Sequence, residues 1–193
     1  VDPTTSRKLG DSFDIAVYLQ KQYPAGNDLF PPQTLDYVFS SDAAILIPLS
    51  ECDGSEYPQY ARFNVNIDAA FTTHVGLMAY GLPFDPATAE QAKAEFVRRA
   101  GVSCWEDLAV TGEQREKLLR SFREMLGGLA KLFGGNGPFL LGDRANYADL
   151  IVGAWLRMAS KTLPAEEWGL VRDWHGGIFG RLHDALEIYA AVH

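Results

Sequence analysis

The chain has 193 residues, of which 47% are hydrophobic and 22% are charged, as is typical of a globular protein with a real core. A formal net charge of −8 argues against nucleic acid as a partner, because a phosphate backbone is repelled unless a local basic patch outweighs the overall field. The sequence has no such basic patch, and no apolar run approaches the roughly 18 residues that a membrane span needs. We therefore expect neither a nucleic acid nor a membrane as the partner.

The first residues predict a short extended piece followed by a helix. Residues 2–6 favour a turn, because proline fixes φ and the Asp, Thr and Ser side chains bond back to the backbone. Residues 7–9 leave room for only a short strand. Asp11 and Ser12 then precede an apolar helical face that runs from Phe13 to Tyr23.

Helical spacing predominates in the next part of the chain. After a proline-containing loop, apolar residues follow helical spacing from Leu35 to Leu46, and a further pattern runs from Tyr60 to Tyr80. Asp85 and Pro86 predict a helix start, since Asp caps free N–H groups and Pro is tolerated at the first helical position. The predicted buried side of this helix consists of Ala89, Ala92, Phe96 and Val97.

The last part of the chain predicts four more helices. Thr111 begins a Thr-x-x-Gln capping box before a long amphipathic helix. Residues 146–160 are apolar nearly all round, so this helix is expected to be the buried centre of its domain. Two shorter helices are predicted over 164–174 and 178–189, which makes the chain mostly α.

The cysteines and histidines point to no disulfide framework and no metal. A secreted disulfide framework needs more cysteines than Cys52 and Cys104, so we expect free thiols in a reducing compartment and a cytoplasmic location. Cys104 is interpreted as a small buried hydrophobic residue rather than a nucleophile. The four histidines show no metal-ligand spacing; they are His74, His175, His183 and His193.

The strongest local signal is the segment 139–150, which reads Phe-Leu-Leu-Gly-Asp-Arg-Ala-Asn-Tyr-Ala-Asp-Leu. The Asn146 side chain is predicted to accept from the backbone N–H of Asp149, and the Asp149 carboxylate from that of Asn146. Both groups also lie at the positive end of the helix dipole. We assign Asn146 and Asp149 a structural role as a helix cap.

This segment resembles a hallmark of the soluble glutathione transferase family. The family's C-terminal domain has a Phe-Leu-x-Gly-Asp-x-x-Ser/Thr-x-Ala-Asp pattern, and here Asn146 replaces the usual Ser or Thr. Residues 9–19 are similar to the turn that ends the last strand of the family's thioredoxin-like domain and opens its third helix. In the family this turn holds the γ-glutamyl group of glutathione, which implies that Asp11 and Ser12 bind glutathione. The residues alone leave open that Asp11 or Ser12 is simply an N-cap.

The resemblance implies a two-domain architecture of which the first domain is incomplete. Residues 1–28 are expected to be a remnant of the thioredoxin-like glutathione-binding domain, and residues 29–193 the all-α C-terminal domain. The family's catalytic Ser, Cys or Tyr lies near the start of the thioredoxin-like domain, so we expect an N-terminally truncated chain whose catalytic residue lies upstream. Pro3 is interpreted as a turn residue rather than the family's cis-proline.

The implied function is that of a glutathione transferase that conjugates or cleaves hydrophobic aromatic substrates with glutathione, without a metal. Segments including 94–99 and 105–109 resemble the fungal Fu-A class, which is related to β-etherases. Family members are usually dimers, which here implies a homodimer through surfaces around 13–23 and 35–47. The competing hypotheses are a non-catalytic ligandin-type binder of aromatic compounds or polyphenols, and a structural appendage.

Overall fold

The structure is a computed structural model, and it describes residues 1–40 and 56–190. Within these ranges the chain is mostly helical, as predicted, and contains no strand. The α-helices are α1 (Ser12–Gln22), α2 (Pro58–Thr73), α3 (Ala89–Ala100), α4 (Gly112–Ala130), α5 (Tyr147–Thr162) and α6 (Ala165–Leu186). Short 3-10 turns are η1 (Val75–Leu77), η2 (Ala79–Gly81), η3 (Trp105–Leu108) and η4 (Glu187–Tyr189).

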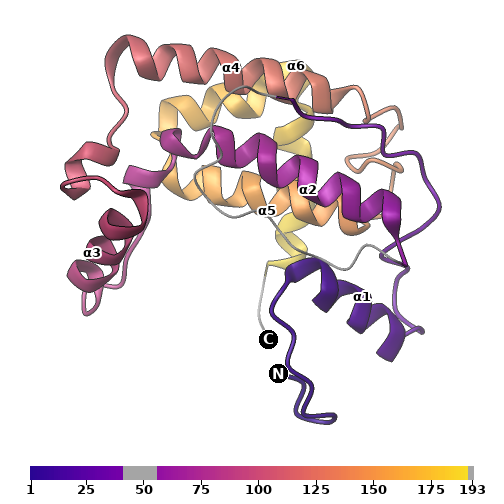
Figure 1. Cartoon of the computed structure of the whole chain (residues 1–193). Coiled ribbons are helices and arrows are strands. Elements are labelled where there is room, and N and C mark those ends of the chain that lie inside the picture. The colour runs from indigo at the N-terminus through magenta and orange to yellow at the C-terminus, as the bar shows by residue number, and fades with distance from the viewer. Residues whose placement is uncertain (41–55, 191–193) are drawn as a thin grey trace.

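Four helices form the body of the molecule. α5 packs against α2 and α6, and α4 packs against α6, so that the four long helices run beside one another (Figure 1). α3 projects from one end of this bundle, and α1 lies below the other end.

α2 and α5 share the centre of the core. The sequence predicts α5 as the most buried helix, but α2 buries nine of its 16 residues and α5 eight of its 16. Phe63, Ile67 and Phe71 of α2 are fully buried, whereas Ala154 and Arg157 of α5 are exposed. The expectation that α5 is the most buried helix is therefore wrong, because one side of it faces solvent.

The predicted helix from Leu35 is wrong over its described part. Residues 35–40 have no regular secondary structure, and residues 41–46 lie outside the described residues. Leu35 and Tyr37 are buried while Asp36 and Val38 are exposed, which is the alternation of an extended segment with one side against the core. The apolar residues of this segment fit the period of a helix as well as the period of a strand. Their spacing alone therefore does not decide between a helix and an extended segment.

The helix predicted at Asp85 begins later and is more exposed than expected. The Asp85 carboxylate accepts a hydrogen bond from the N–H of Ala87 at 2.8 Å, and α3 begins only at Ala89. No residue of α3 is buried, so the predicted buried side is wrong. Because α3 packs mainly on η3, Phe96 joins a small aromatic cluster around Trp105 and stays 42% exposed.

Two further local predictions fail near α3 and α4. Cys104 is exposed rather than buried, because it lies on the projecting α3–η3 part, and Cys52 lies outside the described residues. Thr111 is the N-cap of α4, but its side chain makes no capping hydrogen bond. Gly112 has a φ of +58°, and this left-handed first residue does not present the geometry that a capping box needs.

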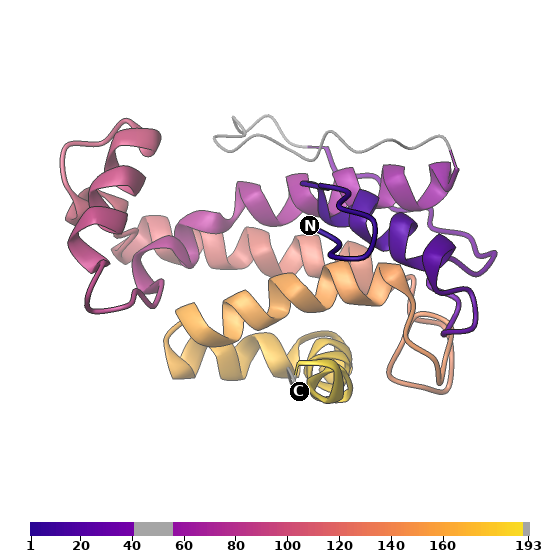
Figure 2. The same ribbon diagram turned by 90° about the horizontal axis from the view of Figure 1, so that it is seen from below.

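The remaining predictions concern the two ends of the chain. Residues 3–5 form the predicted turn, but residues 7–9 form no strand, because a strand requires a neighbouring strand and none is described. The two predicted C-terminal helices are confirmed as the two halves of α6, which break at Trp174–Gly177. Figure 2 shows the second half of α6 nearly end-on beside the first half.

Candidate functional site

The start of α1 is fixed on the helical bundle by one aromatic side chain. Phe13 is fully buried, and its ring lies 5.7 Å from that of Phe30 and 5.3 Å from that of Tyr147, between ring centroids. Edge-to-face contacts of this kind add to the apolar area that such rings bury. The N-terminal end of α1 is therefore positioned by the α5 side of the bundle.

Asp11 and Ser12 lie together at this N-terminal end. Asp11 is the N-cap of α1, and its Oδ1 accepts from the N–H groups of Phe13 at 2.8 Å and Asp14 at 3.4 Å. Ser12 is the first residue of the helix and is exposed. A carboxylate can accept about four hydrogen bonds, so capping and ligand binding are compatible roles for Asp11. The positive end of the helix dipole also favours a ligand's carboxylate here.

A second acid, which sequence analysis missed, lies near Asp11. The half-buried Asp68 of α2 accepts a hydrogen bond from Nε1 of Trp155 at 3.1 Å. Burial raises the pKa of Asp68, the Trp155 hydrogen bond opposes this, and the charge of Asp11 raises it further. The two carboxylates thus come close enough to repel, which favours a bound cation such as an ammonium group. The available signal was that Asp68 is the one acid of α2.

The cap of α5 is built by Asn146 and Asp149. Asn146 Oδ1 accepts from the N–H of Ala148 at 2.9 Å, and Asp149 Oδ2 accepts from the N–H of Asn146 at 2.9 Å. Asp149 Oδ1 also accepts from the N–H of Leu140 at 2.8 Å, a bond that the sequence pattern did not predict. Both capping residues are buried, and burial raises the pKa of Asp149 to about 6 although these hydrogen bonds lower it.

The two helix starts are connected through the segment that joins them. The N–H of Tyr147 donates to the carbonyl of Leu29 at 2.8 Å, and Gln33 Nε2 donates to Asn146 Oδ1 at 3.0 Å. Because Tyr147 also contacts Phe13, the α5 cap holds the surface on which α1 rests. The predicted structural pair and the predicted binding pair therefore share one aromatic cluster.

Other reactive side chains are spread over the part of the chain that the structure describes. In residues 1–40 and 56–190, no three His, Cys, Asp or Glu side chains are grouped to hold a metal ion. None of the helices described has the length and apolar character to cross a membrane. Ser121 Oγ lies 2.9 Å from Nε2 of the buried His74, but Ser121 is in the middle of α4, where backbone N–H groups are bonded within the helix. This pair links α2 to α4 rather than forming an acyl-transfer site.

Comparison with solved structures gives whole-chain similarity to two fungal proteins. The glutathione S-transferase CsGST63524 of Ceriporiopsis subvermispora, in complex with glutathione, is 25% identical with a TM-score of 0.77, covering 100% of this chain and 70% of that chain. The glutathione S-transferase CsGST83044 of the same fungus, also in complex with glutathione, is 22% identical with a TM-score of 0.72. That match covers 97% of this chain and 69% of that chain and shows the fold alone.

Comparison of sequences gives one family match. No curated protein matches the chain. The family model described as "Glutathione S-transferase, C-terminal domain" matches residues 68–189, which include α2 from Asp68 onward and all later helices. Residues 68–189 are more than half of the chain, and the all-helical bundle agrees with the match. The chain belongs to the glutathione S-transferase C-terminal domain family.

Proposed function

We propose that the protein is a glutathione transferase in which Asp11 and Ser12 bind the γ-glutamyl end of glutathione. The observation that carries this is the match of the whole chain, with a TM-score of 0.77, to a glutathione S-transferase in complex with glutathione. The Asp11 carboxylate pairs with the ligand's ammonium group, and Asp68 adds negative charge beside it. The Ser12 hydroxyl and the positive end of the α1 dipole hold the ligand's carboxylate.

The chemistry is attack of the glutathione thiolate on a carbon of a hydrophobic aromatic substrate: a C–S bond forms, and the bond from that carbon to a leaving group, such as a halide or an aryloxide, breaks with its electron pair. The substrate is thereby conjugated or, where the leaving group is an aryloxide, cleaved. The enzyme favours the thiolate by hydrogen bonding to the charged sulfur. We propose that this group belongs to the part of the fold beyond the 70% of the related structure that this chain covers. Cys104 does not suit the role: the Asp107 backbone contact favours its thiolate, but partial loss of hydration and the acids Asp107 and Glu106 outweigh it and raise the pKa of the thiol.

The domain assignment follows from this proposal. We propose that residues 1–28 belong to the glutathione-binding domain and residues 29–193 to the all-α domain of a cytoplasmic enzyme of the Fu-A-like class. Homodimerisation through the outer side of α1 is supported by exposed Ile15, Leu19 and Tyr23, at 38%, 42% and 58%. Phe13, at the start of the range 13–23, does not belong to this surface, because its ring is buried within the chain itself.

Calorimetric titration with glutathione tests the site. A version of this chain preceded by a complete thioredoxin-like domain is expected to bind glutathione, and Asp11→Ala weakens binding by about 1.5–3 kcal/mol, the value of a charge-assisted hydrogen bond. Asp14→Ala removes the same charge from the same turn and serves as the control. Normal binding by Asp11→Ala would leave Asp11 as a helix cap only.

A conjugation assay on an aromatic electrophile tests the activity. The version preceded by a complete thioredoxin-like domain is expected to turn over the electrophile. Residues 1–193 alone are expected to bind glutathione weakly and to be inactive. Turnover by residues 1–193 alone would place the thiol-activating group within this chain and overturn the proposal. Binding of aromatic compounds without turnover by the extended version would favour the ligandin-type alternative.

A further inference from the structure

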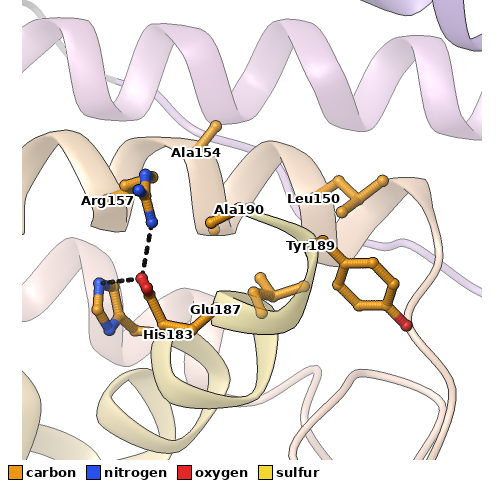
Figure 3. A pocket seen from close by; sticks show the side chains of 9 residues that line it. Leu150, Ala154, Arg157, His183, Glu187, Tyr189 and Ala190 are labelled. Carbon is orange, nitrogen blue, oxygen red and sulfur yellow. Dashed lines mark hydrogen bonds and ion pairs between the residues drawn. The ribbon is translucent and has the colours of Figure 1, made fainter. Parts of the chain in front are cut away.

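A small cavity lies between α5, the end of α6 and η4, and it shares no residue with the Asp11–Ser12 site (Figure 3). Its volume is about 180 Å³. The walls are largely carbon and include Leu150, Gly153, Leu186 and Ala190. Arg157, His183 and Glu187 form its polar end, where Figure 3 shows their side chains pointing toward one another.

The hydrogen bonds around His183 define which ring nitrogen carries the proton. Nδ1 lies 3.3 Å from Oδ1 of Asp184, and a carboxylate only accepts, so we assign the Nδ1–H tautomer to the ring. The Asp184 carboxylate is itself held by two hydrogen bonds from the Arg172 guanidinium, at 2.8 and 2.7 Å. The ring also packs against Trp168, with 5.0 Å between ring centroids. In this tautomer Nε2 of His183 is an acceptor.

That acceptor has no donor in the described part of the chain. Nε2 of His183 is buried and makes no hydrogen bond within residues 1–40 and 56–190. Its nearest charged neighbour is Oε1 of Glu187 at 3.6 Å, which is also an acceptor and lies beyond hydrogen-bond distance. The same Oε1 accepts from Nη1 of Arg157 at 2.7 Å. Two acceptors thus face each other beside a guanidinium donor, and a group with an O–H completes this arrangement.

We propose that the cavity binds a neutral molecule of one-ring size that bears a hydroxyl group. The hydroxyl donates to Nε2 of His183 and accepts from the guanidinium of Arg157, while the ring lies against the carbon walls. The size fits, since an engineered apolar cavity of about 150 Å³ in another protein holds benzene. A ligand carboxylate in the same place would meet the negative charge of Glu187, and a ligand without a hydroxyl would leave Nε2 unpaired.

Titration of the 193-residue chain with phenol, followed by NMR of ¹³C-labelled histidine rings, tests the proposal. A saturable shift confined to the His183 signal is expected, with that signal assigned from His183→Gln. Benzene is expected to bind about five-fold more weakly, the loss of one neutral hydrogen bond. Benzoate is expected to bind about ten-fold more weakly or worse, because its charge faces Glu187.

A blocking variant on α5 keeps the test independent of folding. Ala154 is exposed on the lip of the cavity, so Ala154→Leu places a larger side chain in the mouth at little cost in stability. This variant should lose the phenol-induced shift and keep the wild-type melting temperature. Lys161→Leu, at an exposed position of the same helix outside the cavity, should bind as the wild type does. No saturable shift, equal binding of benzene, tighter binding of benzoate, or an unaffected Ala154→Leu variant would each overturn the proposal.

Discussion

The first turns of α1 and α5 use the same chemistry in opposite surroundings. Each helix begins after a residue whose side-chain oxygen accepts from backbone N–H groups, Asp11 in α1 and Asn146 in α5. In α5 the cap is buried, with Asn146 at 1% and Asp149 at 0% exposure. In α1 the capping carboxylate is half-buried and the neighbouring Ser12 is exposed.

This comparison shows that burial decides whether a capping motif serves as a structural cap or as a binding site. A ligand cannot replace the hydrogen-bond partners of a buried cap. The hydrogen bonds of such a cap therefore stabilise the folded state and bind nothing. A cap at the surface offers the same oriented N–H groups to a ligand from outside. The sequence motif is therefore insufficient to assign a role, and the surrounding helices decide it.

The largest expected effect comes from removing the contact that joins the two helix starts. Phe13→Ala should lower the free energy of unfolding by about 3–4 kcal/mol, because a fully buried aromatic ring is lost and a cavity remains. Urea unfolding measures the loss, and hydrogen exchange should show faster exchange in α1 than in α5. Ile15→Ala on the exposed side of α1 is the control and should have little effect. Unchanged exchange in α1 would show that Phe13 does not hold α1 in place.

The pH dependence of the free energy of unfolding should reveal the contribution of Asp149 in the α5 cap. Burial raises the pKa of Asp149 from 3.8 to about 6, so between these values the folded state binds more protons than the unfolded state. Stability from this group is then complete below about pH 4 and falls by about 3 kcal/mol as the pH rises through 6. Urea unfolding between pH 4 and 7 should show this fall in the wild type and not in Asp149→Ala. Parallel curves for the two proteins would contradict the prediction.

Asp149→Ala at pH 7 should itself cost about 2 kcal/mol, because the N–H groups of Leu140 and Asn146 lose their acceptor in a buried place. The measurement is the urea concentration at the midpoint of unfolding, compared between variants that have the same m-value. Asp143→Ala, four residues before the helix, removes the same charge outside the capping box and provides the comparison. An unchanged midpoint for Asp149→Ala would show that the cap is not needed for folding.

The smallest expected effect on stability belongs to the α1 cap. Asp11→Ala should cost about 1 kcal/mol, since its N–H partners are near solvent and water can replace the carboxylate. Chemical denaturation of Asp11→Ala beside Asp149→Ala at pH 7 makes the comparison direct. If Asp11→Ala proves the more destabilising of the two, the division of roles by burial is wrong.

Local patterns in the sequence were sufficient where the signal is short-range. The α5 cap segment, the helix after Asp11, and the interruption of the C-terminal helix near Trp174 all lie in contiguous residues with turn or capping chemistry. The proximity of Asp68 to Asp11 was not predictable, because it depends on how α2 and α1 meet. The unpaired Nε2 of His183 likewise results from packing between α5 and α6.

The misplaced elements have a common physical reason. Residues 35–40 and α3 carry enough apolar side chains for a helical or buried pattern, but periodicity cannot say whether a neighbouring surface exists to cover them. The 35–40 segment lies along the core in an extended form, while α3 projects from the bundle with no buried residue. Cys104 is exposed because it lies on the same projecting part of the chain as α3.

The break in α6 turns the chain sharply without a separate loop (Figure 2). Residues 12 apart on an uninterrupted helix are separated by about 18 Å along its axis, yet Arg172 and Asp184 meet at 2.7 Å. His175, Gly176 and Gly177 all have positive φ, and these few residues set the angle at which the chain returns. Inserting or deleting one residue between Val171 and Ile178 would therefore redirect the whole C-terminal end of the chain.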